Sequence, residues 1–138
     1  VMKRRIFGTL VLLIALGATA ETPSAPGAEV YFISPRDGET VHNPVTVRFG
    51  LRGMGVAPAG VTQANTGHHH LLIDVAELPA PGQPVPADEQ HRHFGGGQTE
   101  TTLELSPGVH TLQLLLADQA HVPHQPPVVS QRITIQVD

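Results

Sequence analysis

The clearest indication of the fold is the stretch Pro107-Gly108-Val109-His110-Thr111-Leu112-Gln113-Leu114-Leu115-Leu116. A Pro-Gly pair precedes a run rich in Val, Thr and Leu, within which Leu recurs at every second position from Leu112 onward. Side chains alternate between the two faces of a β-strand, and Pro and Gly favour turns. The stretch therefore predicts a strand over residues 109–116, with Leu112 and Leu114 in the core together with Ile73 and Ile133.

Similar short runs of Val, Ile, Thr and Leu occur along most of the chain, each bounded by turn residues such as Asn43-Pro44 or Gly95-Gly96-Gly97. The other expected strands are residues 30–33, 45–49, 69–75, 101–105 and 128–137. The chain contains 14 Gly and 13 Pro, which would interrupt helices repeatedly. We therefore predict an all-β fold, an immunoglobulin-like β-sandwich of about seven strands, with a small β-barrel as the alternative.

The N-terminal segment has the features of a secretory signal peptide. Three basic residues precede an apolar stretch over residues 6–16, and Ala18-Thr19-Ala20 supplies the small residues that signal peptidase requires. We expect residues 1–20 to be removed before Glu21 and the protein to be periplasmic or secreted. Residues 21–27 are rich in Pro, Ser and Ala and predict a flexible linker, so the β-sandwich domain would occupy residues 28–138.

The composition narrows the classes of partner. The chain has no cysteine and nine histidines, with 12 acidic against 8 basic residues. Loss of the signal peptide would leave a net charge of −7 with neutral histidines, which disfavours nucleic acid and anionic membranes as partners. Without cysteine the domain must be held together by its core, with the help of a metal ion if one binds, and not by disulfides.

The histidines suggest a metal site, because imidazole is the commonest side-chain metal ligand and suits zinc and copper(II). The triplet His68-His69-His70 stands directly before the apolar residues Leu71, Leu72 and Ile73. If Leu71 and Ile73 face the core, His69 shares their face, while His68 and His70 project together from the opposite face. Two imidazoles in this relation can bind one ion.

Further histidines lie in segments that could approach this pair. The expected ligands of one copper or zinc site are His68, His70, His93, His121 and His124. Three or four imidazoles suffice for either metal, so at least one of the five should be dispensable. His69 and His110 are either ligands or buried, hydrogen-bonded strand residues, and His42 is a surface turn residue by this interpretation.

Four motifs carry a resemblance to a family of small exported bacterial domains of unknown function. They are Gly67-His68-His69-His70-Leu71-Leu72-Ile73-Asp74, His93-Phe94-Gly95-Gly96-Gly97-Gln98-Thr99-Glu100, Leu105-Ser106-Pro107-Gly108-Val109-His110-Thr111-Leu112-Gln113-Leu114 and His121-Val122-Pro123-His124. The resemblance implies export and a single β domain, and it implies no particular activity. Seven histidines fall within the motifs, whereas His42 and His91 fall outside them.

Three classes of function are compatible with these features. The first, which we predict, is an exported module that binds copper or zinc. The second is a metal-dependent enzyme, with three imidazoles holding the metal and Glu100 or Asp74 as general base; the chain has no H-E-x-x-H and no G-x-S-x-G motif. The third is a non-catalytic module in which the histidines form a hydrogen-bonded network and the surface contacts another exported protein.

Overall fold

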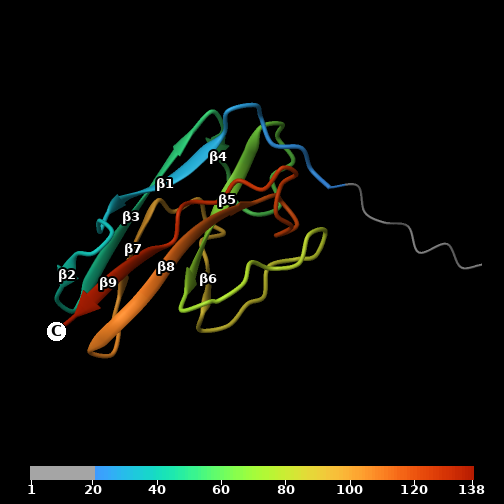
Figure 1. Ribbon diagram of the computed structural model, residues 1–138. Helices are drawn as coiled ribbons and strands as arrows, with labels where there is room; N and C mark the ends of the chain where they lie inside the picture. Colours follow the sequence, from blue (N-terminus) through green and yellow to red (C-terminus); the bar gives the residue numbers. More distant parts are fainter. Residues whose placement is uncertain (1–20) are drawn as a thin grey trace, which may run out of the picture.

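The computed structural model describes residues 21–138, so the expected signal peptide lies outside the described residues. This part of the chain is built from strands and turns without a helix (Figure 1), and consequently contains no helix that could cross a membrane. The strands are β1 (Glu29–Ser34), β2 (Thr40–Val41), β3 (Val45–Arg52), β4 (Gly55–Val56), β5 (Thr66–Ile73), β6 (His91–His93), β7 (Glu100–Leu103), β8 (Gly108–Ala117) and β9 (Ile133–Val137).

The strands form two sheets that pack as a sandwich (Figure 1). One sheet has the order β1-β3-β7, and the other has the order β2-β9-β8-β5-β4, with β6 also paired to β5. The prediction of an all-β sandwich is confirmed, and the arrangement is not a closed barrel. The described residues form nine strands instead of about seven, because β2 and β4 are additional two-residue strands at the sheet edges.

The core lies between the sheets and uses the alternation that the sequence predicts. Leu112, Leu114 and Leu116 of β8 are fully buried and pack with inward-facing residues of β3, such as Val47. Ile73 and Ile133, the other expected core residues, are buried as well. The core is therefore aliphatic on both sheets, and disulfides play no part in it.

The expected strand over residues 128–137 is divided in two. Its second half is β9, whereas Val129 forms only an isolated bridge with Leu115. Between the halves, the Ser130 hydroxyl accepts a hydrogen bond from the Leu114 backbone N–H, at a position where a regular ladder would use a backbone carbonyl. A side chain that takes over a backbone partner interrupts a strand in this way.

The segment expected to be a flexible linker, residues 21–27, is instead hydrogen-bonded to the loop between β8 and β9. The Thr22 hydroxyl donates to the Asp118 carboxylate at 2.6 Å, and the Ser24 backbone N–H donates to the Gln125 carbonyl at 3.1 Å. The Gln125 N–H in turn donates to the Thr22 carbonyl. The loop has backbone groups with no partner in a strand, and residues 22–24 supply hydrogen-bond partners for them. The composition of residues 21–27 alone does not reveal this pairing.

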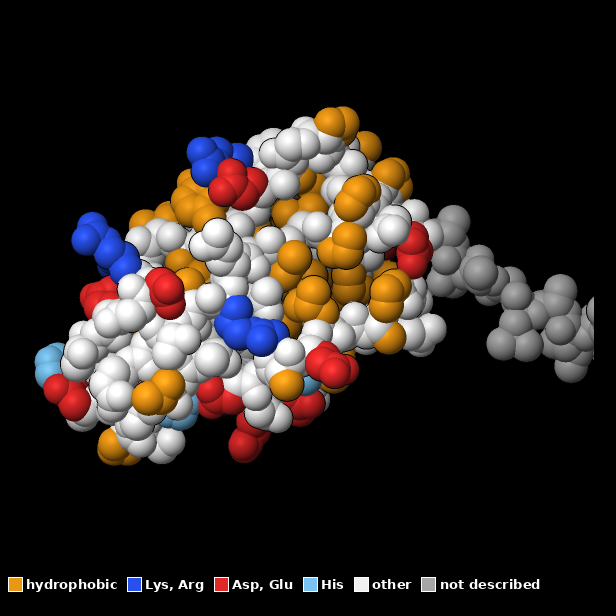
Figure 2. All heavy atoms as spheres, in the orientation of Figure 1, with side chains coloured by type: hydrophobic (Ala, Val, Ile, Leu, Met, Phe, Trp, Pro, Cys, Tyr) orange, Lys and Arg blue, Asp and Glu red, His pale blue; other side chains and the backbone are white. Residues whose placement is uncertain are grey.

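Loops cover the outer face of the six-stranded sheet over β5 and β8. Val85, from the loop between β5 and β6, packs there with Leu115, Ala117 and Val129 in a second, smaller hydrophobic cluster. Outward-facing residues of β5 are consequently buried although they lie outside the main core. The surface drawn in Figure 2 carries basic and acidic side chains among polar and hydrophobic ones, without a broad basic patch.

Candidate metal centre

The histidine triplet lies in β5, and its members alternate between the two faces of the sheet. His69 points into the core between the sheets, where its ring lies 5.1 Å from that of Phe49. His68 and His70 lie on the outer face, with ring centroids 4.8 Å apart. All three side chains are buried, since the loops described above cover the outer pair. The predicted distribution of the triplet over the two faces is confirmed.

Strand pairing brings His93 to this outer face. Strand β6 is antiparallel to β5 and places His93 directly opposite His70, so that their ring centroids lie 5.2 Å apart. Cross-strand neighbours on one face are close enough to interact through their side chains. A Cβ atom on Gly95 would overlap the His93 ring, so the glycine leaves room for the ring to lie over the cluster.

A tight turn after β8 carries His121 to the same place. One carboxylate oxygen of Asp118 accepts hydrogen bonds from the Ala120 and Val122 N–H groups, and the His121 N–H donates to the Asp118 carbonyl. The His121 carbonyl accepts a hydrogen bond from the Val85 N–H. These contacts hold His121 at a φ of 66°, a left-handed conformation that costs a non-glycine residue roughly 1 kcal/mol or more.

Asp118 is not among the residues predicted for the site, although its position in the sequence carries a signal. Asp118 is the first residue after the predicted strand that ends near Ala117, and aspartate at such a position commonly accepts hydrogen bonds from the following N–H groups. Its role in placing His121 depends on the direction in which the turn folds, which the sequence does not specify.

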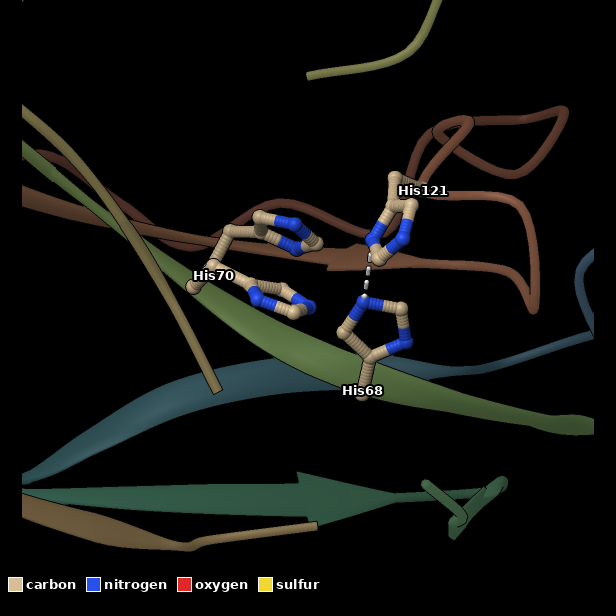
Figure 3. A group of neighbouring side chains, drawn as sticks. His68, His70 and His121 are labelled. Atoms are coloured by element: carbon tan, nitrogen blue, oxygen red, sulfur yellow. Dashed lines mark hydrogen bonds between the residues drawn. The ribbon is translucent and has the colours of Figure 1, made fainter. Parts of the chain in front are cut away.

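Four histidines converge into one group. His68 and His121 share a hydrogen bond between Nε2 and Nδ1 at 3.1 Å, and the labelled rings in Figure 3 point toward one another. One ring nitrogen from each member lies within 4.8 Å of the corresponding nitrogens of the others. The group consists of His68, His70, His93 and His121. Two strands and one loop contribute to it, and it could hold a metal ion.

The fifth expected ligand, His124, lies apart from this group. It belongs to the loop between β8 and β9, and its side chain is buried. Its Nε2 lies 3.2 Å from the Thr66 carbonyl and its Nδ1 3.4 Å from the Leu116 carbonyl. A Cβ atom on Gly67 would stand only 2.8 Å from His124 Cε1, so the imidazole packs closely over the start of β5. His124 thus fastens the loop to the sheet, and the structure brings together four of the five predicted ligands.

The remaining histidines pair with carboxylates elsewhere. His110 contacts the Asp74 carboxylate through Nδ1 at 2.7 Å and the Ser106 carbonyl through Nε2 at 2.8 Å, which ties the start of β8 to the end of β5. His91 pairs with Asp88, and the exposed His42 pairs with Asp138. Of the two general bases considered for an enzyme, Asp74 is engaged by His110 and Glu100 by Arg48. The four-histidine group contains no carboxylate.

Burial keeps the histidines of β5 neutral. It is the largest cause that lowers the pKa of His68 to about 4, with the neighbouring imidazoles acting in the same direction and Asp118 in the opposite one. Burial and the neighbouring imidazoles lower the pKa of His70 to about 3 and also lower that of His93. Because a metal ligand must be unprotonated, His68, His70 and His93 are in the binding form at neutral pH.

The cluster also contains ring nitrogens without a partner. The Nδ1 atoms of His68 and His70 are buried and receive no hydrogen bond from residues 21–138. Leaving a buried polar group unpaired costs roughly 1–3 kcal/mol, and such groups are uncommon in folded proteins. One nitrogen from each of the four rings lies close to those of the other three, and a bound cation would complete this arrangement.

Comparison with known proteins gives a family without an assigned activity. The model of the family described as "Domain of unknown function (DUF4399)" matches residues 47–138, a range that includes all four histidines of the group. Searches of curated proteins and of solved structures each found no match. The chemistry of the site must therefore be judged from its own residues.

Proposed function

The chain belongs to the DUF4399 family, a domain of unknown function, and from the geometry of its histidine group we propose that it binds one transition-metal ion, copper or zinc. The ligands are His68, His70, His93 and His121. The single observation that carries the proposal is the convergence of one nitrogen from each of these residues within 4.8 Å. Four neutral imidazoles are a sufficient donor set for either metal.

The structural-network interpretation explains the cluster less well. In such a network each imidazole would donate or accept through both nitrogens, as His110 does with Asp74 and Ser106. In the cluster, among residues 21–138, only the contact between His68 and His121 is a hydrogen bond, and two buried nitrogens have no partner. Metal coordination needs one nitrogen from each ring in one place, which is the convergence that a hydrogen-bonded network does not require.

The proposal is tested by calorimetric titration of tag-free protein with zinc and with copper(II) at neutral pH. Wild-type protein should bind close to one equivalent, and a His68→Ala/His70→Ala double variant should lose that binding. His42→Ala is the matched control, because His42 is exposed and pairs with Asp138 away from the group, and it should bind as wild type does. Absence of binding by the wild type would refute the proposal in favour of the network.

We further propose that the protein binds the metal outside the cytoplasm. The support is the basic, apolar N-terminal segment and the small residues Ala18-Thr19-Ala20. Intact-mass measurement on protein from its native host should give a chain that begins at Glu21. A mass that still includes residues 1–20 would contradict cleavage at this position.

A further inference from the structure

The four rings of the group are arranged as a tetrahedron and not as a square. Five of the six distances between ring centroids lie between 4.6 and 5.2 Å, and the sixth, between His70 and His121, is 6.1 Å. In a square, the centroid distances across the two diagonals would exceed the four distances along the sides by a factor of about 1.4. Here the pair opposite to the long one, His68 and His93, is only 5.0 Å apart.

The size of the arrangement also fits a tetrahedral ion. Zinc binds imidazole nitrogen at about 2.0–2.1 Å, and the ring centre lies roughly 1 Å beyond the nitrogen, so four tetrahedral imidazoles have centroids about 5 Å apart. The observed distances centre on this value. The spacing of the ring centroids is therefore that of four imidazoles around one tetrahedral ion.

The protein supplies four donors for the four positions of such an ion. Catalytic zinc sites keep three protein ligands and an open position for water, whereas structural sites have four protein ligands. The group has four imidazoles, and the carboxylates considered as general bases, Asp74 and Glu100, are paired elsewhere. These features are those of a site that holds an ion and does not activate water on it.

Resting on the proposed metal binding, we infer that the group is a closed, tetrahedral zinc site. Its four imidazoles fill the coordination sphere and leave no position for water or substrate. Copper(II) prefers a tetragonal arrangement, so it must distort either its own geometry or the protein to enter. The domain accordingly holds or carries zinc and does not use it as a catalyst.

Cobalt(II) is the probe for this geometry, since it takes zinc sites and its visible absorption is strong in tetrahedral and weak in octahedral coordination. Wild-type protein loaded with cobalt should absorb strongly, and addition of azide should leave the spectrum unchanged because no position is open. His93→Ala removes the most exposed ligand and opens one position. Its cobalt spectrum should change when azide is added, whereas that of the control His42→Ala should not.

The outcomes separate this inference from the proposed function. Weak, octahedral absorption by a wild-type protein that binds cobalt and zinc would overturn the tetrahedral site and leave metal binding intact. A wild-type spectrum that shifts with azide would overturn the closed site in the same way. If zinc, cobalt and copper(II) all fail to bind, the proposed function itself is wrong.

Discussion

At the scale of single residues, His69 shows the cost of placing imidazole in an apolar core. Its ring lies against Phe49, and neither ring nitrogen has a hydrogen-bond partner among residues 21–138. Burial lowers the pKa of His69 to about 4, so the side chain is neutral at physiological pH. The sequence left His69 open as ligand or core residue, and in the structure it is a core residue on the face opposite to the four-histidine group.

We therefore expect His69→Leu to raise the free energy of unfolding of the metal-free protein by about 1–3 kcal/mol, because an apolar side chain of similar size removes two unpaired nitrogens. Zinc affinity should stay unchanged. Urea denaturation and calorimetry measure the two quantities, and His69→Gln is the polar control that should bring no gain in stability. A loss of zinc binding in His69→Leu would show that this residue contributes to the site.

Gly95 lies beneath the His93 ring and offers a second test at this scale. Gly95→Ala should displace the ring and weaken zinc binding roughly tenfold or more, the usual effect of disturbing the support of a ligand. Gly96→Ala is the matched control, because its Cβ would meet only the end of the flexible Gln98 side chain. Equal zinc affinity of the two variants would show that the ring tolerates the methyl group.

At the scale of elements, β5 supplies two histidines of the group, while β6 and the turn after β8 supply one each. The position of His68 and His70 on one face was predictable, because the two-residue period of a strand is a local property. The approach of His93 and His121 was not, since it depends on how the loops between β5 and β6 and between β8 and β9 fold back. His121 and His124 belong to the same motif, yet His121, with its left-handed backbone, joins the group, whereas His124 bonds to the Thr66 and Leu116 carbonyls.

The Asp118 turn should therefore control metal affinity. Asp118→Ala removes the acceptor of two loop N–H groups and should weaken zinc binding by about 10–100-fold through His121. Asp118→Asn keeps a carbonyl oxygen at that position and should restore most of the affinity. The comparison uses zinc titration and thermal denaturation together, and variants that lose stability without losing affinity would argue against the positioning role.

Strand β8 carries the core of the domain. Leu114 is fully buried, so Leu114→Ala should lower the free energy of unfolding by about 2–5 kcal/mol. Val109 on the same strand is exposed, and Val109→Ala should change stability by no more than about 0.5 kcal/mol. Chemical denaturation of both variants tests whether Leu114 lies in the core and Val109 at the surface. Similar losses of unfolding free energy in the two variants would contradict these positions.

At the scale of the whole molecule, stability should depend on pH through the buried histidines. The folded-state pKa values of His68, His69 and His70 are about 4, 4 and 3, below the ordinary value of 6.5. Below pH 6.5 the unfolded chain therefore binds protons that the folded chain does not, and unfolding becomes more favourable. His110 has the opposite effect on stability. Burial lowers its pKa, but the hydrogen bonds that its ring donates to the Asp74 carboxylate and the Ser106 carbonyl outweigh burial and raise the pKa.

The pKa of His93 is lowered as well, so four histidines with a lowered pKa outweigh one with a raised pKa. The metal-free protein should lose on the order of several kcal/mol of stability as pH falls from about 6.5 to about 4, since one pKa unit corresponds to about 1.4 kcal/mol. Urea denaturation at several pH values measures this slope. His69→Leu should reduce it, and a stability independent of pH in this range would contradict the buried, neutral state of these residues.

The repetition in His68-His69-His70 permits a second pairing of β5 during folding, and zinc binding at the proposed site would select against it. A slip of one residue in the pairing of β5 with β8 would exchange the two faces of β5, and one histidine instead of two would then face outward. Such a slip leaves part of the local sequence unchanged, because it can put His69 where His68 stood, His70 where His69 stood and Leu72 where Leu71 stood. Zinc, however, would bind tightly only to the native pairing. It would therefore stabilise the native register of β5 relative to the shifted one early in folding.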